Sequence, residues 1–271
     1  MEPCQSQNMK IKINLLIPFV FVLFCINAMA YNCKPIKKDI YQIKVYHLKT
    51  NEQVTEIDLF LQKAYLPAIH RLGIKNIGVF KNLGIDTAIE KTIYVWMPLR
   101  SFNQLSEIED RLTNDLVYNN DGASFLLASF NTPAFTRIES ILLRAFSLMP
   151  HYHQPSFTGA VNEKIYELRS YEAASEKLYQ QKVKMFNEGG EIALFNRLGF
   201  NAAFYAEVLS GSHMPNLMYM TSFENIESRN EHWKTFGADP EWKKLSALPE
   251  YKNTVSKADI ILLHPTAYSE L

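Results

Sequence analysis

The chain contains an internal repeat, and this feature limits its fold more than any other. Residues 40–46, IYQIKVY, align with residues 165–171, IYELRSY, at an offset of 165 − 40 = 125 residues. Three shorter matches follow in the same order: RLG at 71–73 with RLG at 197–199, Tyr94-Val95 with Tyr219-Met220, and ILLR at 141–144 with ILLH at 261–264. Because the 271 residues suffice for two small domains, the repeat predicts one module used twice.

The order of elements is clearest in the second copy. Segment 165–171 alternates as a strand, and Ser175 can cap a long helix that ends at Gly199. The later elements are strands at 202–209 and 217–223 joined by a turn-rich loop at 210–216, a helix marked by Ile226, Trp233 and Phe236, a helical turn capped by Asp239-Pro240, and a closing strand at 258–264. This β-α-β-β-α-β order predicts a ferredoxin-like α+β module.

Two such modules in tandem predict a pseudo-dimer in which the two sheets pack together as a barrel-like pair. Helices would cover one face of each sheet, and the two remaining faces would pack together. We expect the modules at residues 39–150 and 163–271. The segment 151–162 between them is polar, carries proline and glycine, and is predicted to be a linker.

The first thirty residues have the pattern of a signal peptide. A positively charged start precedes an apolar stretch from Leu15 to Ile26, and Ala28-Met29-Ala30 is a cleavage signal. The stretch is shorter than the ~20 residues that span a membrane, so we expect cleavage near Ala30 and export, periplasmic or secreted, without a stable membrane anchor. Met9 is an alternative start to Met1, because residues 1–8 add nothing to such a signal.

Charge and cysteine content restrict the partners and the crosslinks of the protein. The chain has 28 basic and 28 acidic residues; removing residues 1–30 leaves 28 − 2 = 26 and 28 − 1 = 27. This balance lacks the basic excess of nucleic-acid-binding proteins. Cys33 is the single cysteine left after cleavage, so no intrachain disulfide is expected, and the protein relies on its core or on homo-oligomerisation.

The second copy resembles the NIPSNAP family. The resemblance rests on YELRSY at 166–171, FNEGGE at 186–191, PNLMYMTSFENIESRNEHWKTF at 215–236 and DPEWKKL at 239–245, and covers nearly all of 165–268. The first copy keeps only the strand and RLG signals. The resemblance implies a dimeric α+β barrel of ferredoxin-like type. Its eukaryotic members are linked with vesicular transport and mitochondrial quality signalling, contexts that a secreted protein lacks, so only the fold is carried over.

Alternation along segment 165–171 places Glu167, Arg169 and Tyr171 on one strand face. If the apolar face packs on the helices, these side chains point between the sheets. There, Glu167 and Arg169 must be paired, lie at the rim or face a ligand. The predicted ligand-binding set consists of Glu167, Arg169, Tyr171, Tyr205, Tyr219 and His264, the last at the end of the closing strand near the barrel mouth.

Other conspicuous residues have structural interpretations. Gly189-Gly190 interrupts the long helix, and the first copy breaks its helix near 63–64, so a bend is predicted in both. A phosphate-binding loop would instead follow a strand. His151 and His153 lie in the linker without acidic or cysteine neighbours, which predicts no metal site. The aromatic stripe at Trp233, Phe236 and Trp242 has the spacing of a helix core.

Two functions remain open at this stage. In the first, which we prefer, an exported barrel without a cofactor binds a small organic ligand or assembles with itself or with a partner protein. In the second, the protein is an oxidoreductase or monooxygenase of the dimeric α+β barrel class, cofactor-free or haem-dependent. Arg169 would then hold an anionic intermediate, and Glu167 or His264 would move protons.

Overall fold

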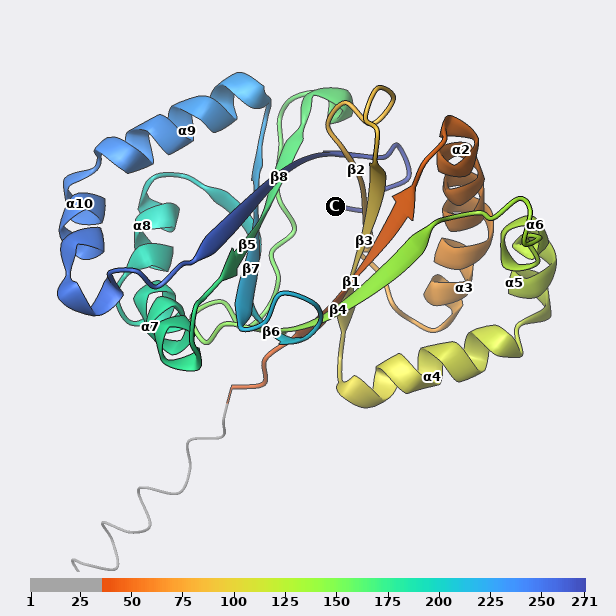
Figure 1. Ribbon diagram of the computed structural model, residues 1–271, viewed down its shortest axis with the longest axis horizontal. Helices are drawn as coiled ribbons and strands as arrows, with labels where there is room; N and C mark the ends of the chain where they lie inside the picture. Colours follow the sequence, from red (N-terminus) through yellow and green to blue (C-terminus); the bar gives the residue numbers. More distant parts are fainter. Residues whose placement is uncertain (1–35) are drawn as a thin grey trace, which may run out of the picture. The chain divides into compact units, whose positions relative to one another are not determined.

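The computed structural model describes residues 36–271. The predicted signal peptide, with its cleavage site at Ala30, and Cys33 lie outside the described residues. Two sets of helices flank a central group of strands (Figure 1).

The N-terminal module begins with a strand and ends with one. Its elements are β1 (Ile40–Leu48), α2 (Asn51–Phe60), a π-helical turn η1 (Leu61–Tyr65), α3 (Leu66–Arg71), β2 (Gly78–Asn82), β3 (Lys91–Leu99), α4 (Phe102–Thr113), α5 (Leu116–Asp121), α6 (Ala123–Leu126) and β4 (Arg137–Ala145).

The C-terminal module repeats this order. Its elements are the 3₁₀ turn η2 (Val161–Glu163), β5 (Ile165–Glu172), α7 (Glu176–Asn187), α8 (Glu191–Arg197), β6 (Asn201–Ser210), β7 (Asn216–Phe223), α9 (Ile226–Ala238), α10 (Pro240–Ala247), the 3₁₀ turn η3 (Pro249–Tyr251) and β8 (Lys257–Pro265).

The eight strands within residues 36–271 join in one closed antiparallel barrel. The strand order is β1-β3-β2-β8-β5-β7-β6-β4, so each module contributes four neighbouring strands in the ferredoxin-like arrangement. The modules meet at two equivalent seams, β2 with β8 and β4 with β6. Closure leaves no sheet edge unpaired. The predicted fold, two tandem ferredoxin-like modules forming a dimeric α+β barrel, is confirmed.

Helix boundaries follow local sequence signals. The Ser175 side chain accepts a hydrogen bond from the Leu178 N–H at the start of α7, as predicted. Gly199 has φ +75°, the left-handed conformation expected after α8. The predicted break in the long helix occurs in both modules: Gly190, φ +99°, separates α7 from α8, while the turn η1 separates α2 from α3.

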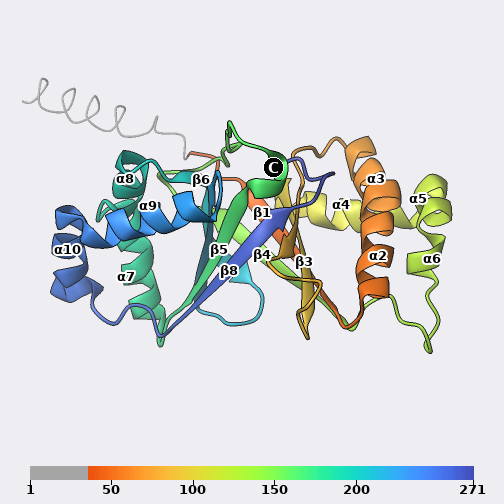
Figure 2. The ribbon, with the colours of Figure 1, turned by 90° about the horizontal axis from the view of Figure 1, so that it is seen from above.

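The core has three parts, because the barrel interior is packed as well as both helix layers. Helices α2 to α6 cover the outside of β1 to β4, and helices α7 to α10 cover the outside of β5 to β8 (Figure 2). The interior is filled by Tyr41, Ile43, Val45, Phe80, Trp96, Leu143, Tyr166, Leu168, Phe204, Met218, Met220 and Leu263, among others. Both faces of each sheet are therefore buried.

Segment 151–162, predicted as the linker, connects β4 to β5 without strand structure. Tyr152 packs on Trp96 with ring centroids 5.2 Å apart, and Phe157 packs on Tyr166 at 5.8 Å. Together with Leu271, which also joins the barrel core, they cover one end of the barrel. The proposed domain boundaries at 150 and 163 stay a prediction.

Candidate functional site

Strand β5 presents Glu167, Arg169 and Tyr171 to the helices, not to the barrel interior. Tyr166 and Leu168 point inward instead. We expected the three polar side chains to point between the sheets. That prediction is wrong, because they lie on the opposite face of β5, toward the helices. The prediction assumed that only the face of the sheet toward the helices is apolar. In a closed barrel, the face toward the interior is at least as apolar.

Glu167 is the centre of a buried ion network. Its carboxylate accepts hydrogen bonds from Arg169, from Arg229 and, at 3.0 Å, from the indole nitrogen of Trp233. The Arg169 guanidinium lies 3.5 Å from the centre of the Trp233 ring, and donates to the Tyr171 hydroxyl at 2.9 Å. Burial alone would lower the pKa of Arg169, but Tyr219, Tyr171 and Glu167 raise it above its usual range. Of the three alternatives expected for Glu167 and Arg169, namely pairing, a place at the rim or contact with a ligand, the structure shows pairing.

The two further predicted tyrosines belong to the same layer. The Tyr171 and Tyr219 hydroxyls lie 2.9 Å apart, and the Tyr219 and Tyr205 rings pack 5.6 Å apart. Burial raises the pKa of Tyr205 and of Tyr219. These contacts join five of the six predicted ligand-binding residues in one layer between β5 to β7 and the helices.

His264 is separate from this group. It lies at the end of β8 opposite Lys81 of β2, half-buried, with its Nδ1 2.9 Å from the Lys164 carbonyl oxygen. The mouth of the barrel that contains a cavity is at the other end of β8. None of the six predicted residues lines that cavity, and their role in ligand binding stays a prediction.

One mouth of the barrel holds a cavity of about 120 Å³. Its apolar floor continues the barrel core, and its polar wall comes from strands of both modules and from the loop between β6 and β7. The lining residues are Val45, His47, Tyr94, Glu139, Ile141, Ser170, Val208, Ser212, His213, Asn216, Met218, Asp259 and Ile261.

His47 is fixed at this mouth by two carboxylates. Its Nδ1 lies 2.8 Å from Glu90 and its Nε2 lies 2.8 Å from Glu139, whose carboxylate also pairs with Arg137. Burial alone would raise the pKa of Glu139, but hydrogen bonding to His47 and the charge of Arg137 hold it below its usual range. These bonds hold the His47 ring in one orientation at the cavity wall.

The opposite wall contains the buried side-chain amide of Asn216, which is hydrogen-bonded through its nitrogen only among the described residues. Asn216, 2% exposed, donates from Nδ2 to the Ser170 hydroxyl at 2.7 Å, while its Oδ1 has no partner within residues 36–271. An unpaired buried acceptor costs about 1–3 kcal/mol, so it favours a donor that enters the cavity.

The β6–β7 loop borders the cavity. His213 has a positive φ of 69° and lies 3.0 Å from Glu172, while the Ser212 hydroxyl lies 3.4 Å from Glu139. Lys257 also pairs with Glu172 and with Asp259 at this rim. Contacts from both modules therefore hold the loop at the mouth.

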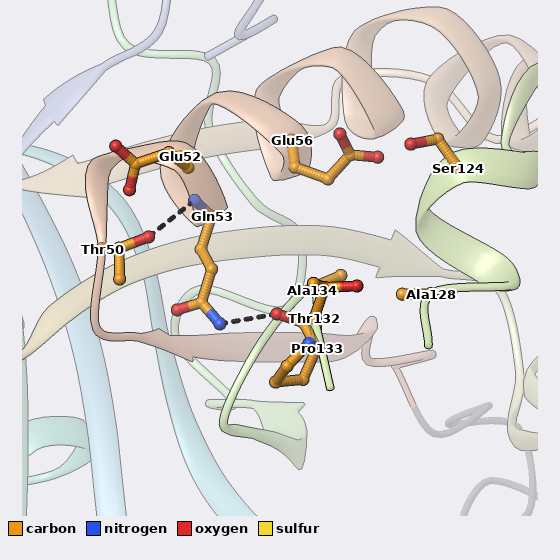
Figure 3. A pocket seen from close by; sticks show the side chains of 9 residues that line it. All are labelled: Thr50, Glu52, Gln53, Glu56, Ser124, Ala128, Thr132, Pro133 and Ala134. Carbon is orange, nitrogen blue, oxygen red and sulfur yellow. Dashed lines mark hydrogen bonds between the residues drawn. The ribbon is translucent and has the colours of Figure 1, made fainter. Parts of the chain in front are cut away.

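A larger hollow of about 430 Å³ lies on the N-terminal module between α2, α6 and the segment that precedes β4 (Figure 3). It is a surface groove, because Ala134 is the one buried residue among those that line it. Gln53 bridges its walls by donating to the Pro133 carbonyl oxygen at 2.7 Å. The groove offers less enclosure than the barrel mouth, which is therefore the better candidate for a small ligand.

Two negative findings concern the described part of the chain. In residues 36–271, no three His, Cys, Asp or Glu side chains are grouped so as to hold a metal ion. Within the same residues, none of the helices combines the length and apolarity required to cross a membrane.

Comparison with known protein families gives a match that covers the C-terminal module. Residues 166–270 match the family model NIPSNAP, the family that the motifs of the second copy resemble. No curated protein is detectably similar to the chain in sequence.

Solved structures extend the likeness to both modules. A candidate monooxygenase from Fusobacterium nucleatum is 8% identical with a TM-score of 0.56, and covers 85% of this chain and 93% of its own. A candidate monooxygenase from Lactobacillus acidophilus is 13% identical, with a TM-score of 0.54 and coverage of 84% and 94%. An anthrone oxidase-like protein is 10% identical, with a TM-score of 0.51 and coverage of 85% and 92%. At these identities the likeness shows the fold.

Sequence reasoning missed the mouth residues His47, Glu139 and Asn216. They lie on β1, β4 and β7, and only barrel closure brings them together. Each is a polar residue near one end of its strand, but this pattern does not show which strand ends meet.

Proposed function

We propose that this protein is exported and binds a small organic ligand in the cavity at the barrel mouth. The observation that carries the proposal is Asn216, a residue of the cavity lining whose buried side-chain oxygen has no partner among the described residues. A few fixed polar groups above an apolar floor are typical of small-molecule sites. No comparable feature of the cavity among the described residues supports assembly with a partner protein.

The cavity limits the size of the ligand. At about 120 Å³ it is slightly smaller than a 150 Å³ protein cavity known to hold benzene. A single ring or a short branched chain matches this volume. The mouth allows a polar substituent to extend toward the rim.

Binding can be tested by thermal unfolding with a set of single-ring compounds. A ligand present at about ten times its Kd stabilises the folded protein by about 1.4 kcal/mol, which raises Tm by a few degrees. The proposal expects such a rise for at least one compound. Unchanged Tm across the set would contradict it.

Export rests on residues 1–30 and needs its own test. Expression of the full chain in a bacterial host, followed by N-terminal sequencing of the protein outside the cytoplasm, should yield Tyr31 as the first residue. Recovery in the cytoplasm with residues 1–30 intact would contradict export.

An oxidoreductase remains the second candidate, favoured by His47 at the cavity wall. A histidine at the wall of a cavity is a residue type that can transfer a proton to or from a bound molecule. A haem group does not fit, because its macrocycle is far larger than a cavity of this volume. Oxygen uptake that depends on the bound compound and is lost in His47→Gln would establish the enzyme; its absence would leave a binding protein.

A further inference from the structure

The charges that line the cavity indicate what kind of ligand it takes, given the binding function proposed above. Two carboxylates, Glu139 and Asp259, line it, and no lysine or arginine does so among the described residues. The rim adds Glu90 and Glu172. An organic anion would therefore meet two carboxylates, while the two histidines of the lining, His47 and His213, are already bonded to Glu90, Glu139 and Glu172.

The buried polar atom of the lining that has no partner among the described residues is an acceptor, Asn216 Oδ1. The Asp259 carboxylate pairs with Lys257, a half-exposed side chain outside the cavity lining, and a cation bound in the cavity would share this carboxylate. An ammonium group carries three donors and no acceptor, so it complements such a wall. Tyr94, also in the lining, is an aromatic residue of the kind that attracts cations.

We infer that the barrel mouth binds a small primary amine. Its apolar body would lie on Val45, Ile141 and Met218, and its ammonium would be held by Asn216 and Asp259. This inference deepens the proposed binding function by naming the class of ligand. Asn216 and Asp259 are its specificity-determining residues.

Three compounds of nearly equal shape separate the class from binding itself. Benzylamine, benzyl alcohol and benzoate share one ring and differ in the charge of the attached group. We expect benzylamine to bind with a Kd of about 1 mM or below. Benzyl alcohol should bind about tenfold more weakly, and benzoate should not bind measurably, in isothermal titration of the full mature chain.

Variants identify the residues responsible. Asp259→Asn should weaken benzylamine binding about tenfold and leave benzyl alcohol within about twofold, because only the charged ligand loses a partner. Glu207→Gln is the matched control, since Glu207 on β6 pairs with Arg144 and does not line the cavity. It should change neither constant.

The outcomes separate the two claims. Binding of benzoate or benzyl alcohol as tight as that of benzylamine would overturn the amine inference and leave the binding function standing. An equal loss of benzylamine affinity in Asp259→Asn and Glu207→Gln would also overturn it. Failure of all three compounds would remove the proposed binding function together with the inference.

Discussion

The carboxylate of Glu167, in the middle of strand β5, accepts a hydrogen bond of 3.0 Å from the indole nitrogen of Trp233 on helix α9. This bond connects the sheet to its helix layer and places Glu167 outside the barrel interior. The residue therefore holds the C-terminal module together, and its removal should affect stability before binding.

Glu167→Gln keeps the shape of the side chain but removes the charge that Arg169 and Arg229 share. Because Glu167 is fully buried, we expect a loss of about 3–5 kcal/mol in the free energy of unfolding. Urea denaturation measures it. Glu163→Gln, at an exposed position just before β5, should stay within about 0.5 kcal/mol of wild type. Equal stability of the two variants would contradict the network described here.

Filling the cavity should abolish binding without unfolding the protein. Val208 is 4% exposed and lines the mouth, so Val208→Phe places a ring where the ligand would lie. We expect more than tenfold weaker benzylamine binding and a destabilisation of at most about 1–3 kcal/mol. Val117→Phe, at a half-exposed position on α5, is the control. Undiminished binding by Val208→Phe would exclude this cavity as the site.

Two glycines should respond in opposite ways to replacement by alanine. Gly190 has φ +99° and open space around it, so a Cβ is strained by the backbone alone, at a cost of about 1–3 kcal/mol. Gly237 lies near the end of α9 with nothing within 4 Å of an added Cβ. There, alanine should stabilise by about 0.5–1 kcal/mol. Thermal unfolding of both variants checks the signs, and a stabilised Gly190→Ala variant would contradict the left-handed helix break at Gly190.

Glu224 should contribute to the loss of stability in acid. Its carboxylate accepts bonds from the N–H groups of Thr158 and Gly159, both at 2.8 Å, and these lower its pKa from the usual 4.5. A carboxyl whose pKa is depressed by folding stabilises above its unfolded pKa, and this contribution disappears as the pH falls through the folded value. Glu224→Gln should therefore be less stable than wild type at pH 7, with the difference shrinking below pH 4.5. Urea titrations at pH 7 and below pH 4.5 measure the difference in unfolding free energy between Glu224→Gln and wild type. The same difference at the two pH values would contradict the role of Glu224.

Much of the fold could be predicted because the repeat is real in three dimensions. Tyr41 and Tyr166, matched by sequence, both point into the barrel, and Ile141 and Ile261 occupy corresponding places opposite β1 and β5. Arg71 and Arg197 of the RLG matches both pair with an aspartate that caps a helix, Asp115 and Asp239 respectively.

The match of Tyr94 with Tyr219 is out of register by one residue. Tyr94 pairs with Val45 in the interior, whereas Tyr219 pairs with Arg169 on the helix side. A slip of one residue reverses the face of a strand, and alternation cannot reveal it when both faces are buried.

Because both faces of β5 are buried, the sequence could not show which face points into the barrel, and the predicted site was assigned to the wrong one. Glu167, Arg169 and Tyr171 share one face of β5 as predicted, yet the face toward the helices and the face toward the barrel are equally enclosed. The cavity depends on which strands become neighbours at the two seams between modules, and no local pattern carries that information.

The most direct test of ligand binding at the barrel mouth is a methyl NMR titration of protein labelled at the methionine methyl groups. Met218 lines the cavity, while Met185 is buried beside Lys182 in the helix layer. Benzylamine should shift the Met218 signal, assigned with Met218→Leu, along a saturable curve, and should leave Met185 in place. A Met218 signal unmoved by benzylamine, benzyl alcohol and benzoate alike would contradict the account.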